Sequence, residues 1–317
     1  MTARLLVRHD GAVVERPPEE LSDLQGRLCW LDVADPGNED FHRIAKELAL
    51  HPLALEDARK RHQRPKVDQY EGHYFIVLYA VDEGQDGEAR FHEVSVFIIG
   101  HALVTVHEGG VAALAEVEVR FREGRIGTVG QLLHGLLDAM VDGYFPLVDA
   151  IGDRLDELEE TVIVASGAPQ SRPALRELFQ IKRRMLALRQ RVAPEREVLA
   201  VLARGDLGLF EREIIVYFQD VYDHIVRVTD EIDIFREIAS NVIDAHLAAV
   251  SNRLNEVMKV VTSLATVLLV VSVVTGFFGM NFTGLPFDSA VAMWGAIGGM
   301  VAASIALTGL FRARGWL

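Results

Sequence analysis

Two long stretches near the end of the chain contain apolar and small residues and no charge, at 260–278 and at 289–311. Each is about long enough to cross the roughly 30 Å hydrocarbon core of a bilayer as a helix that rises about 1.5 Å per residue. The alternative is a helical hairpin buried in a soluble core, but core helices rarely stay uncharged over this length. We therefore predict two transmembrane helices joined by a short loop at 279–288.

Basic residues flank these stretches only on the side away from the loop. Arg253 and Lys259 precede the first stretch, the tail at 312–317 holds two arginines, and the loop has no basic residue. Cytoplasmic segments next to membrane helices carry an excess of lysine and arginine. This distribution therefore predicts that both termini, including the basic tail, are cytoplasmic and that the loop faces outward.

The chain before the first apolar stretch shows a long helical pattern. Across 209–259, apolar residues recur every three or four positions, and neither proline nor glycine interrupts 209–275. This period predicts a stalk helix that continues without a break into the first transmembrane helix. A helix of that combined length spans about 100 Å. It would couple a cytoplasmic body mechanically to the membrane.

Residues 1–127 show a mixed pattern of strands and helices. Runs rich in β-branched and aromatic residues predict strands, and they lie at 28–33, 74–81, 91–99 and 103–106. Helices are predicted after the turn at 35–38, with Asn38 as the N-cap, and at 52–59 and 111–123. We therefore predict a cytoplasmic α/β domain within an α+β membrane protein.

Residues 128–208 are predicted to be helical. The first helix, at 131–164, is acidic, the second, at 173–203, is basic, and a Ser-Gly-Ala-Pro break at 166–169 separates them. The opposite charges predict an antiparallel hairpin whose helices are paired along their length, although each exposed ion pair would add little stability. Some of the acids would also concentrate cations.

One face of the first transmembrane helix and the end of the stalk carries mostly small and mildly polar residues. They recur at spacings of three or four: Asn255, Met258, Val261, Ala265, Leu269, Ser272, Gly276 and Gly279. Two helices cannot enclose a channel, so a pore would need several copies of the chain around one axis. The alternative for this face is contact between helices, and the sequence leaves both open.

The composition narrows the function classes. The net charge of −14 argues against nucleic-acid binding and suits the attraction of cations. The single cysteine, Cys29, excludes an internal disulfide and a cysteine metal cluster. The first ten residues lack the apolar core of a signal peptide. The histidines show no HExxH spacing and the chain has no Walker A sequence, so we expect neither a metal hydrolase nor a site for ATP as the energy source, and no cofactor.

Several sequence blocks resemble the CorA family of divalent metal ion transporters. The first is Gly279-Met280-Asn281, between the two apolar stretches; the others are LHPLALED at 50–57, HQRPKV at 62–67, YFQDVYDH at 217–224 and NEVMK at 255–259. The resemblance runs from about residue 28 to the end of the chain. It implies a homopentameric funnel with a cytoplasmic α/β/α domain and a long helix that lines the pore. Family members carry Mg²⁺ and often Co²⁺ or Ni²⁺, and the similar ZntB branch moves Zn²⁺.

The resemblance also implies roles for residues of the pore. The selectivity filter would be Gly279, Met280 and Asn281, and the apolar gate would be Met258, Val261 and Leu269. Mg²⁺ gives up its water reluctantly, so a filter should offer neutral oxygens to a hydrated ion, as an asparagine side chain can. Many family members carry an acid two residues after the asparagine, where this chain has Thr283. The first acid here is Asp288, which we expect to draw cations to the mouth.

A regulatory metal site is implied as well. In the family, a divalent cation between neighbouring cytoplasmic domains holds the pore closed, and Asp220 matches the stalk aspartate of that site. Its partner on the adjacent subunit would be Asp82, with Glu83 and Asp86 as alternatives. Opposed carboxylates repel each other when the cation leaves. Loss of cytoplasmic Mg²⁺ would therefore favour the open state.

Three functions remain for comparison. The first is a passive channel of the cell membrane for Mg²⁺, Co²⁺ and Ni²⁺, driven by the membrane potential. The second is a Zn²⁺ transporter, coupled to protons, which the Thr-Gly-Leu-Pro sequence at 283–286 favours. The third, of another class, is a membrane-anchored metal sensor or enzyme. A monomeric state in mild detergent would favour the third.

Overall fold

A computed structural model of the chain describes residues 3–9, 11–24, 26–37, 39–83, 89–164, 171–205, 207–280 and 289–317. The chain divides into two compact units. The first comprises Met1–Glu159 and Arg176–Ser240, and the second comprises Glu160–Leu175 and Asn241–Leu317.

A seven-stranded mixed sheet forms the centre of the first unit. Its strands are β1 (Ala3–His9), β2 (Ala12–Arg16), β3 (Cys29–Val33), β4 (Lys66–Tyr70), β5 (His73–Glu83), β6 (Ala89–Ile99) and β7 (Ala102–Val106). They lie in the order β2-β1-β3-β7-β6-β5-β4. β3 and β7 run parallel, and the other neighbouring strands run antiparallel. The four predicted strands are confirmed as β3, β5, β6 and β7, within a few residues at their ends.

Three strands, β1, β2 and β4, were not predicted, because charged or polar residues border or interrupt their short apolar stretches. β2 and β4 lie at the two edges of the sheet, and neither contains a fully buried residue. β1 is an inner strand that carries two arginines, each with a distant partner. Arg4 lies 3.2 Å from Asp32 and 3.0 Å from Glu118, and Arg8 donates to the carbonyl of Ile126 at 2.8 Å. A local sequence pattern cannot reveal ion pairs and hydrogen bonds between residues that lie so far apart in the sequence.

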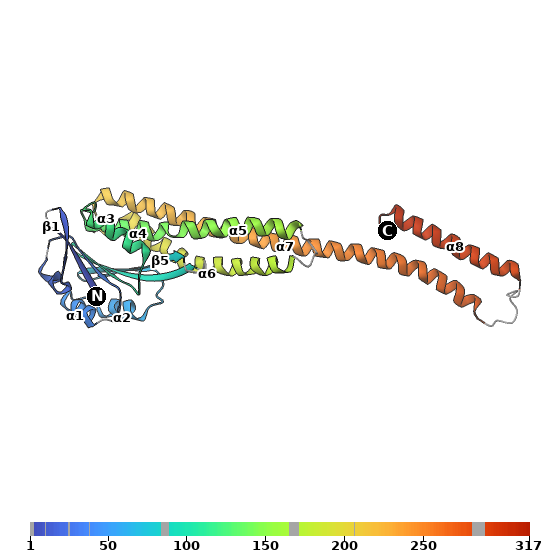
Figure 1. Cartoon of the computed structure of the whole chain (residues 1–317), viewed down its shortest axis with the longest axis horizontal. Helices are drawn as coiled ribbons and strands as arrows, with labels where there is room; N and C mark the ends of the chain where they lie inside the picture. Colours follow the sequence, from blue (N-terminus) through green and yellow to red (C-terminus); the bar gives the residue numbers. More distant parts are fainter. Residues whose placement is uncertain are drawn as a thin grey trace. The chain divides into compact units, whose positions relative to one another are not determined.

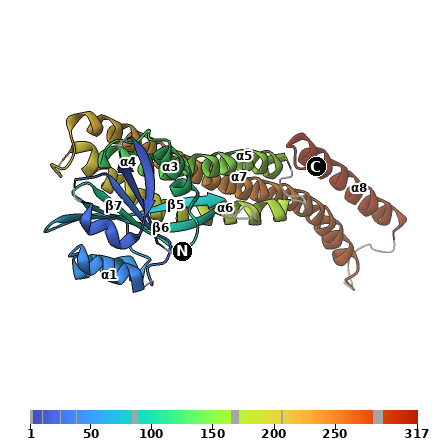
Figure 2. The same ribbon diagram turned by 60° about the vertical axis from the view of Figure 1, so that its left-hand side comes forward.

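Helices cover both faces of the sheet and make the unit an α/β/α sandwich. α1 (Glu39–Glu47) and α2 (Pro52–Lys60) lie on one face, and α3 (Ala112–Arg122) and α4 (Val129–Asp142) lie on the other (Figure 1). Figure 2 shows α1 opposite α3 and α4 from a second direction. A short 3₁₀ helix, η1 (Pro18–Asp23), joins β2 to the segment before β3. Asn38, the predicted N-cap, lies outside the described residues.

Neighbouring residues of one strand build the two halves of the core. On β3, Leu31 belongs to the cluster that packs under α1 and α2, together with Phe41 and Phe97, whose rings lie 6.4 Å apart. The preceding residue, Trp30, contacts Phe121 of α3 at a ring distance of 6.0 Å. Successive side chains of a strand point to opposite faces, so a fully buried strand such as β3 needs apolar side chains on both sides.

The prediction of one acidic helix over 131–164 is wrong, because Gly143 separates α4 from α5 (Tyr144–Val164). Gly143 keeps helical dihedral angles, but a Cβ at this position would lie only 3.1 Å from the carbonyl oxygen of Val81. Tyr144 adds a second contact, since its hydroxyl donates to the carbonyl of Tyr79 at 3.0 Å. The junction is therefore seated against β5, and this places Asp142 beside the end of that strand.

α5, α6 (Ser171–Arg204) and the first half of α7 (Arg212–Phe278) lie side by side (Figure 1). α5 approaches α7 closely at Gly152, where a Cβ would meet the ring of Phe235 at 2.6 Å. The expected pairing of acids on the first helix with bases on the second is reversed in one ion pair between α5 and α6. Arg154 of α5 binds Glu177 of α6 at 2.6 Å.

A carboxyl group of α6 is buried against β5. Glu195 is 1% exposed, and its Oε1 accepts the N–H of Tyr79 at 2.7 Å and lies 3.2 Å from the hydroxyl of Tyr144. Burial raises the pKa of Glu195 to about 8, because removal from water disfavours the charged form more than these two hydrogen bonds favour it. At neutral pH this side chain is therefore mostly protonated.

We expect Glu195→Gln to make the protein more stable than the parent at alkaline pH. In the parent, the folded state holds one more proton than the unfolded state between the ordinary pKa of 4.5 and about 8. Stability should therefore fall by about 1.4 kcal/mol for each pH unit in that window. Glutamine keeps the acceptor oxygen and removes the titration. The measurement is the thermal midpoint of the full-length protein across this range. Glu197→Gln, at an exposed site on the same helix, should leave the parental slope unchanged.

The second unit contains the two predicted membrane helices. α7 continues as one helix to Phe278, and α8 (Ala290–Ala313) follows. The most apolar windows of α7 and α8 have mean hydropathies of 2.3 and 1.8, with 6% and 0% of their residues buried. In the described part of the chain, these two helices are long and apolar enough to span a membrane. The prediction that the stalk and the first apolar stretch form one unbroken helix is confirmed.

Candidate metal site and pore helix

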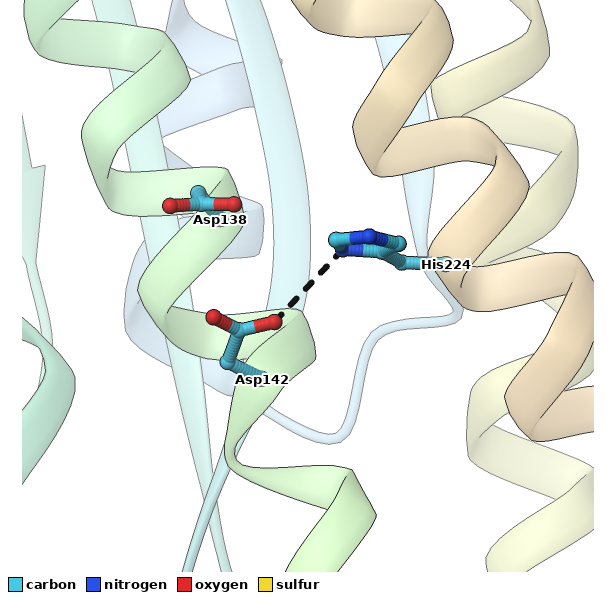
Figure 3. Close-up of side chains that lie close together, drawn as sticks. All are labelled: Asp138, Asp142 and His224. Carbon is cyan, nitrogen blue, oxygen red and sulfur yellow. Dashed lines mark ion pairs between the residues drawn. The ribbon is translucent and has the colours of Figure 1, made fainter.

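Two helices of the first unit bring two carboxylates and one imidazole together (Figure 3). Asp138 and Asp142 lie on α4, and His224 faces them from α7. One ligand atom from each residue lies within 4.8 Å of the other two. Ligand oxygens lie about 2.0–2.6 Å from a Mg²⁺ or Ca²⁺ ion, so ligands on opposite sides of one ion are about 4–5 Å apart. A single divalent cation can therefore contact all three residues.

Helical spacing explains why these side chains share a site. Asp138 and Asp142 are four residues apart, so they lie on one face of α4. Asp220 and His224 stand in the same relation on α7. The start of α4 is held by Thr128, whose hydroxyl oxygen accepts the N–H of Gln131 at 3.2 Å. The four-residue spacings therefore give α4 and α7 one polar face each.

The carboxylate of Asp142 is destabilised in the absence of a cation. The pKa of Asp142 is raised, first by partial burial and then by the negative charge of Asp138, whereas His224 and Arg120 act in the opposite direction. Arg120 is 3.9 Å from Asp138. Like charges one helical turn apart repel each other. A divalent cation would remove both the repulsion and the cost of burying the charge.

His224 is held with one nitrogen toward these acids. Its Nδ1 is buried and lies 3.6 Å from an oxygen of Asp142, which is too long for a hydrogen bond. Among the described residues, no hydrogen-bond partner reaches this atom. Phe145 packs edge-on against the ring at 5.8 Å. The site therefore contains a positioned nitrogen that a metal ion could use.

The two residues predicted to form the regulatory site lie near this group of ligands. Asp220 is exposed on α7, one turn before His224. The pKa of His134 of α4 is lowered by burial, and the negative charges of Asp138 and Asp220 oppose this shift without reversing it. Asp82 lies on β5, next to the residue that Gly143 contacts, and its carboxylate is 3.1 Å from Nε2 of His92. The pairing of Asp82 with Asp220 of another subunit stays a prediction.

Comparison with known proteins supports the resemblance in the sequence. The family described as CorA-like Mg²⁺ transporter protein matches residues 25–313. The chain belongs to the CorA family. It is 36% identical over 264 residues to the cobalt/magnesium transport protein CorA of Thermotoga maritima, covering 81% of this chain and 74% of that one. It is 30% identical to a putative metal ion transporter of Bacillus subtilis, with 90% and 89% covered.

A solved structure shows the same fold for a CorA protein. The complete structure of the CorA magnesium transporter from Methanocaldococcus jannaschii superposes with a TM-score of 0.84. The identity is 23%, and the alignment covers 100% of this chain and 99% of the other. The CorA family is a family of transporters, which is not a class of enzymes.

In this CorA-family chain, the predicted pore residues lie on the second half of α7, except Gly279, which follows the last residue of that helix. They are exposed in the single chain: Asn255, Met258, Val261, Ala265, Leu269, Ser272, Gly276 and Gly279. The apolar side chains among them, Met258, Val261 and Leu269, are 59%, 53% and 62% exposed. Apolar groups this exposed need a lipid or protein surface to cover them.

The predicted filter begins where α7 ends. Gly279 donates its N–H to the carbonyl of Thr275 at 2.9 Å, and the N–H of Met280 reaches the carbonyl of Phe277 at 3.2 Å. Asn281 and the predicted mouth residue Asp288 lie outside the described residues, as does the alternative Asp86. The side chain of Glu83 is likewise outside them.

The sequence analysis did not identify Asp138, Asp142 and His224 as metal ligands. Asp138 and Asp142 were not singled out because they belong to a stretch rich in acids, and His224 was noted only as part of the block at 217–224 that resembles the family. A signal was present in the spacing, since acid–acid and acid–histidine pairs four residues apart mark one helical face. The packing of α4 against α7, which unites the two faces, is visible only in the structure.

Proposed function

We propose that the chain is one subunit of a homopentameric channel of the cell membrane that carries Mg²⁺, and also Co²⁺ and Ni²⁺, inward. Both termini lie in the cytoplasm, and the loop at 279–288 forms the outer mouth. Membership of the CorA family supports this assignment, as does the cobalt/magnesium transport protein among its relatives. The five copies supply the walls that two membrane helices cannot provide alone.

The observation that carries the proposal is the continuity of α7. One helix of 67 residues bears Asp220 and His224 in the first unit and the pore face in the second. Within α7, no proline or glycine precedes Gly276, so the helix has no such hinge before that residue. A change in the position of the cytoplasmic half of α7 is therefore transmitted to the pore. The gate is the apolar ring that Met258, Val261 and Leu269 make around the axis, which closes by excluding water.

Cytoplasmic Mg²⁺ regulates this channel by binding the acidic residues of α4, α7 and β5. Bound cation favours the closed state because it neutralises the charges of Asp138 and Asp142. Between subunits, it neutralises Asp220 of one chain together with Asp82 of its neighbour. When the cation leaves, the uncompensated carboxylates repel and the α7 helices separate. The cation and the closed state stabilise each other to the same extent, as linkage requires.

A Zn²⁺ transporter is the second candidate, and one observation favours it. The ligand group contains His224, and Zn²⁺ accepts an imidazole nitrogen readily, whereas Mg²⁺ prefers oxygen ligands. The test is ion flux through the purified protein in liposomes, with Mg²⁺, Co²⁺, Ni²⁺ and Zn²⁺ compared side by side. Mg²⁺ flux that needs no pH gradient is expected. Flux confined to Zn²⁺ and dependent on a pH gradient would instead support the second candidate.

We expect Asp142→Asn to weaken cation binding at the α4–α7 site. The substitution keeps the shape of the side chain and removes the charge that a divalent ion neutralises. The loss should be at least about tenfold in affinity, since interactions with charged groups contribute about 1.5–3 kcal/mol. The measurement is titration of the full-length protein with Mn²⁺, which takes the same oxygen ligands as Mg²⁺. Binding should also weaken as the pH falls, because protons compete for Asp142, whose pKa is raised.

Asp149→Asn is the matched control for this experiment. Asp149 is an exposed acid on α5, and the substitution makes the same change in charge. Its Mn²⁺ affinity should equal that of the parent. Equal losses in the two variants would show that overall negative charge, and not the site between α4 and α7, attracts the ion.

A further inference from the structure

A separate cavity of the first unit has a basic lining. It has a volume of about 420 Å³ and lies between the end of α2, the paired strands β5 and β6, the loop after β7, and α6. Three arginines line it, Arg61 from the end of α2, Arg90 from β6 and Arg191 from α6. The chain as a whole is acidic, with 46 acids and 32 lysines and arginines. A cavity lined by three guanidinium groups therefore differs in charge from the rest of the protein.

The two acids in this lining have partners, although Oε1 of Glu93 has no hydrogen-bond partner among the described residues. Glu93 accepts the N–H of Gln63 at 3.0 Å and the hydroxyl of Tyr79 at 3.1 Å. Glu108 forms an ion pair with Arg61. With two carboxylates for three guanidinium groups, which stay charged at any physiological pH, the lining has an excess of positive charge.

Two of the three arginines, Arg191 and Arg61, have defined positions in the fold. The guanidinium carbon of Arg191 lies 4.4 Å from the ring centre of Phe91, and one of its nitrogens donates to the carbonyl of Ala187 at 3.2 Å. A guanidinium over a ring face keeps N–H groups at its edge for other acceptors. Arg61 has φ of +54°, a conformation that is uncommon and costly for residues other than glycine and often occurs at ligand sites.

The loop after β7 leaves room for a ligand beside its backbone. Gly109 has φ of +71°, and a Cβ at Gly109 or Gly110 would meet no atom within 4 Å. Both glycines line the cavity. Without side chains, they let a ligand approach the backbone closely. The N–H of Gly109 is not available to it, because this group already donates to the carbonyl of Ala34 at 3.4 Å.

We propose that this cavity binds a small polyphosphate anion, either inorganic pyrophosphate or the phosphate groups of a nucleotide. Guanidinium groups match phosphate oxygens with paired hydrogen bonds. The volume lies within the range of about 300–1,000 Å³ that is typical of small-molecule sites and leaves room for more than one phosphate. The site is distinct from the α4–α7 ligands, although His92 in its lining also contacts Asp82.

The test is calorimetric titration of the full-length protein after divalent cations have been removed on a chelating resin. Pyrophosphate and ATP should each bind once per chain, and adenosine should not bind. Arg90→Ala should weaken both anions by at least about tenfold, because the exposed Arg90 supplies charge to the site and little to the core. Arg59→Ala removes the same charge from an exposed site on α2 outside the cavity, and should leave both affinities unchanged.

Arg61→Gln provides a second variant from another element and should weaken both anions as well. The proposal fails if neither anion binds, or if ATP binds and pyrophosphate does not. It also fails if adenosine binds as tightly as ATP, or if Arg59→Ala weakens binding as much as Arg90→Ala.

Discussion

Asn281→Leu is expected to reduce Mg²⁺ flux by at least about 100-fold, because hydrogen bonds to charged partners contribute about 1.5–3 kcal/mol each and every subunit loses one. Leucine occupies a similar volume but offers no oxygen to the water around the ion. The hydrated Mg²⁺ ion, which gives up its water reluctantly, would then lose the oxygen that accepts hydrogen bonds from its water shell. The measurement is the initial rate of Mg²⁺ entry into liposomes that contain equal amounts of parent or variant protein.

Thr283→Leu is the control for this prediction. It places a leucine in the same loop, two residues further on, and retains the asparagine. Its flux should stay within about threefold of the parent, since a change below about 0.7 kcal/mol is expected when no contact to the ion is lost. Conduction that survives Asn281→Leu would mean that this residue is not part of the filter.

Asp220→Ala is expected to leave a channel that conducts but no longer closes at high internal Mg²⁺. The carboxylate contributes to the cation site that holds the closed state, so its removal shifts the equilibrium toward the open state at every Mg²⁺ concentration. The internal Mg²⁺ concentration that halves the flux should rise by at least about tenfold, which corresponds to about 1.4 kcal/mol. Flux measured against a series of internal Mg²⁺ concentrations gives this value directly.

Asp230→Ala makes the same change at another exposed position of α7. Ten residues separate it from Asp220, which places it on a different face of the helix. Its inhibition by internal Mg²⁺ should match the parent. Unchanged inhibition in Asp220→Ala would contradict a regulatory role for that residue.

The parts of the fold that follow from local pattern could be predicted from the sequence. α7 was recognised because its apolar period is unbroken, and β3, β5, β6 and β7 because each contains a run rich in β-branched and aromatic residues. β1 was missed because it contains Arg4 and Arg8, whose partners on β3, on α3 and in the loop after α3 are far away in the sequence. The break at Gly143 was missed because its cause is the nearby carbonyl of Val81, which no local pattern contains.

For the candidate sites too, a local pattern identifies residues that share one helix but not residues that come from distant parts of the chain. Helical spacing alone places the predicted pore residues on one side of α7, and their lining of a pore stays a prediction. Asp138, Asp142 and His224 were not predicted, because they come from helices far apart in the sequence and meet only when α4 packs on α7. The partner of Asp220 depends on contact between subunits, so neither the sequence pattern nor the structure of one chain determines it.

The central claim is that copies of this chain form a passage through which divalent cations move down their electrical gradient. The most direct measurement is Mg²⁺ entry into liposomes containing the purified protein, as the inside-negative potential is increased, with neither ATP nor a pH gradient present. Two charges gain about 4.6 kcal/mol per 100 mV, so entry should rise with the potential. An entry rate that does not respond to the potential, or that requires a pH gradient, would contradict the account.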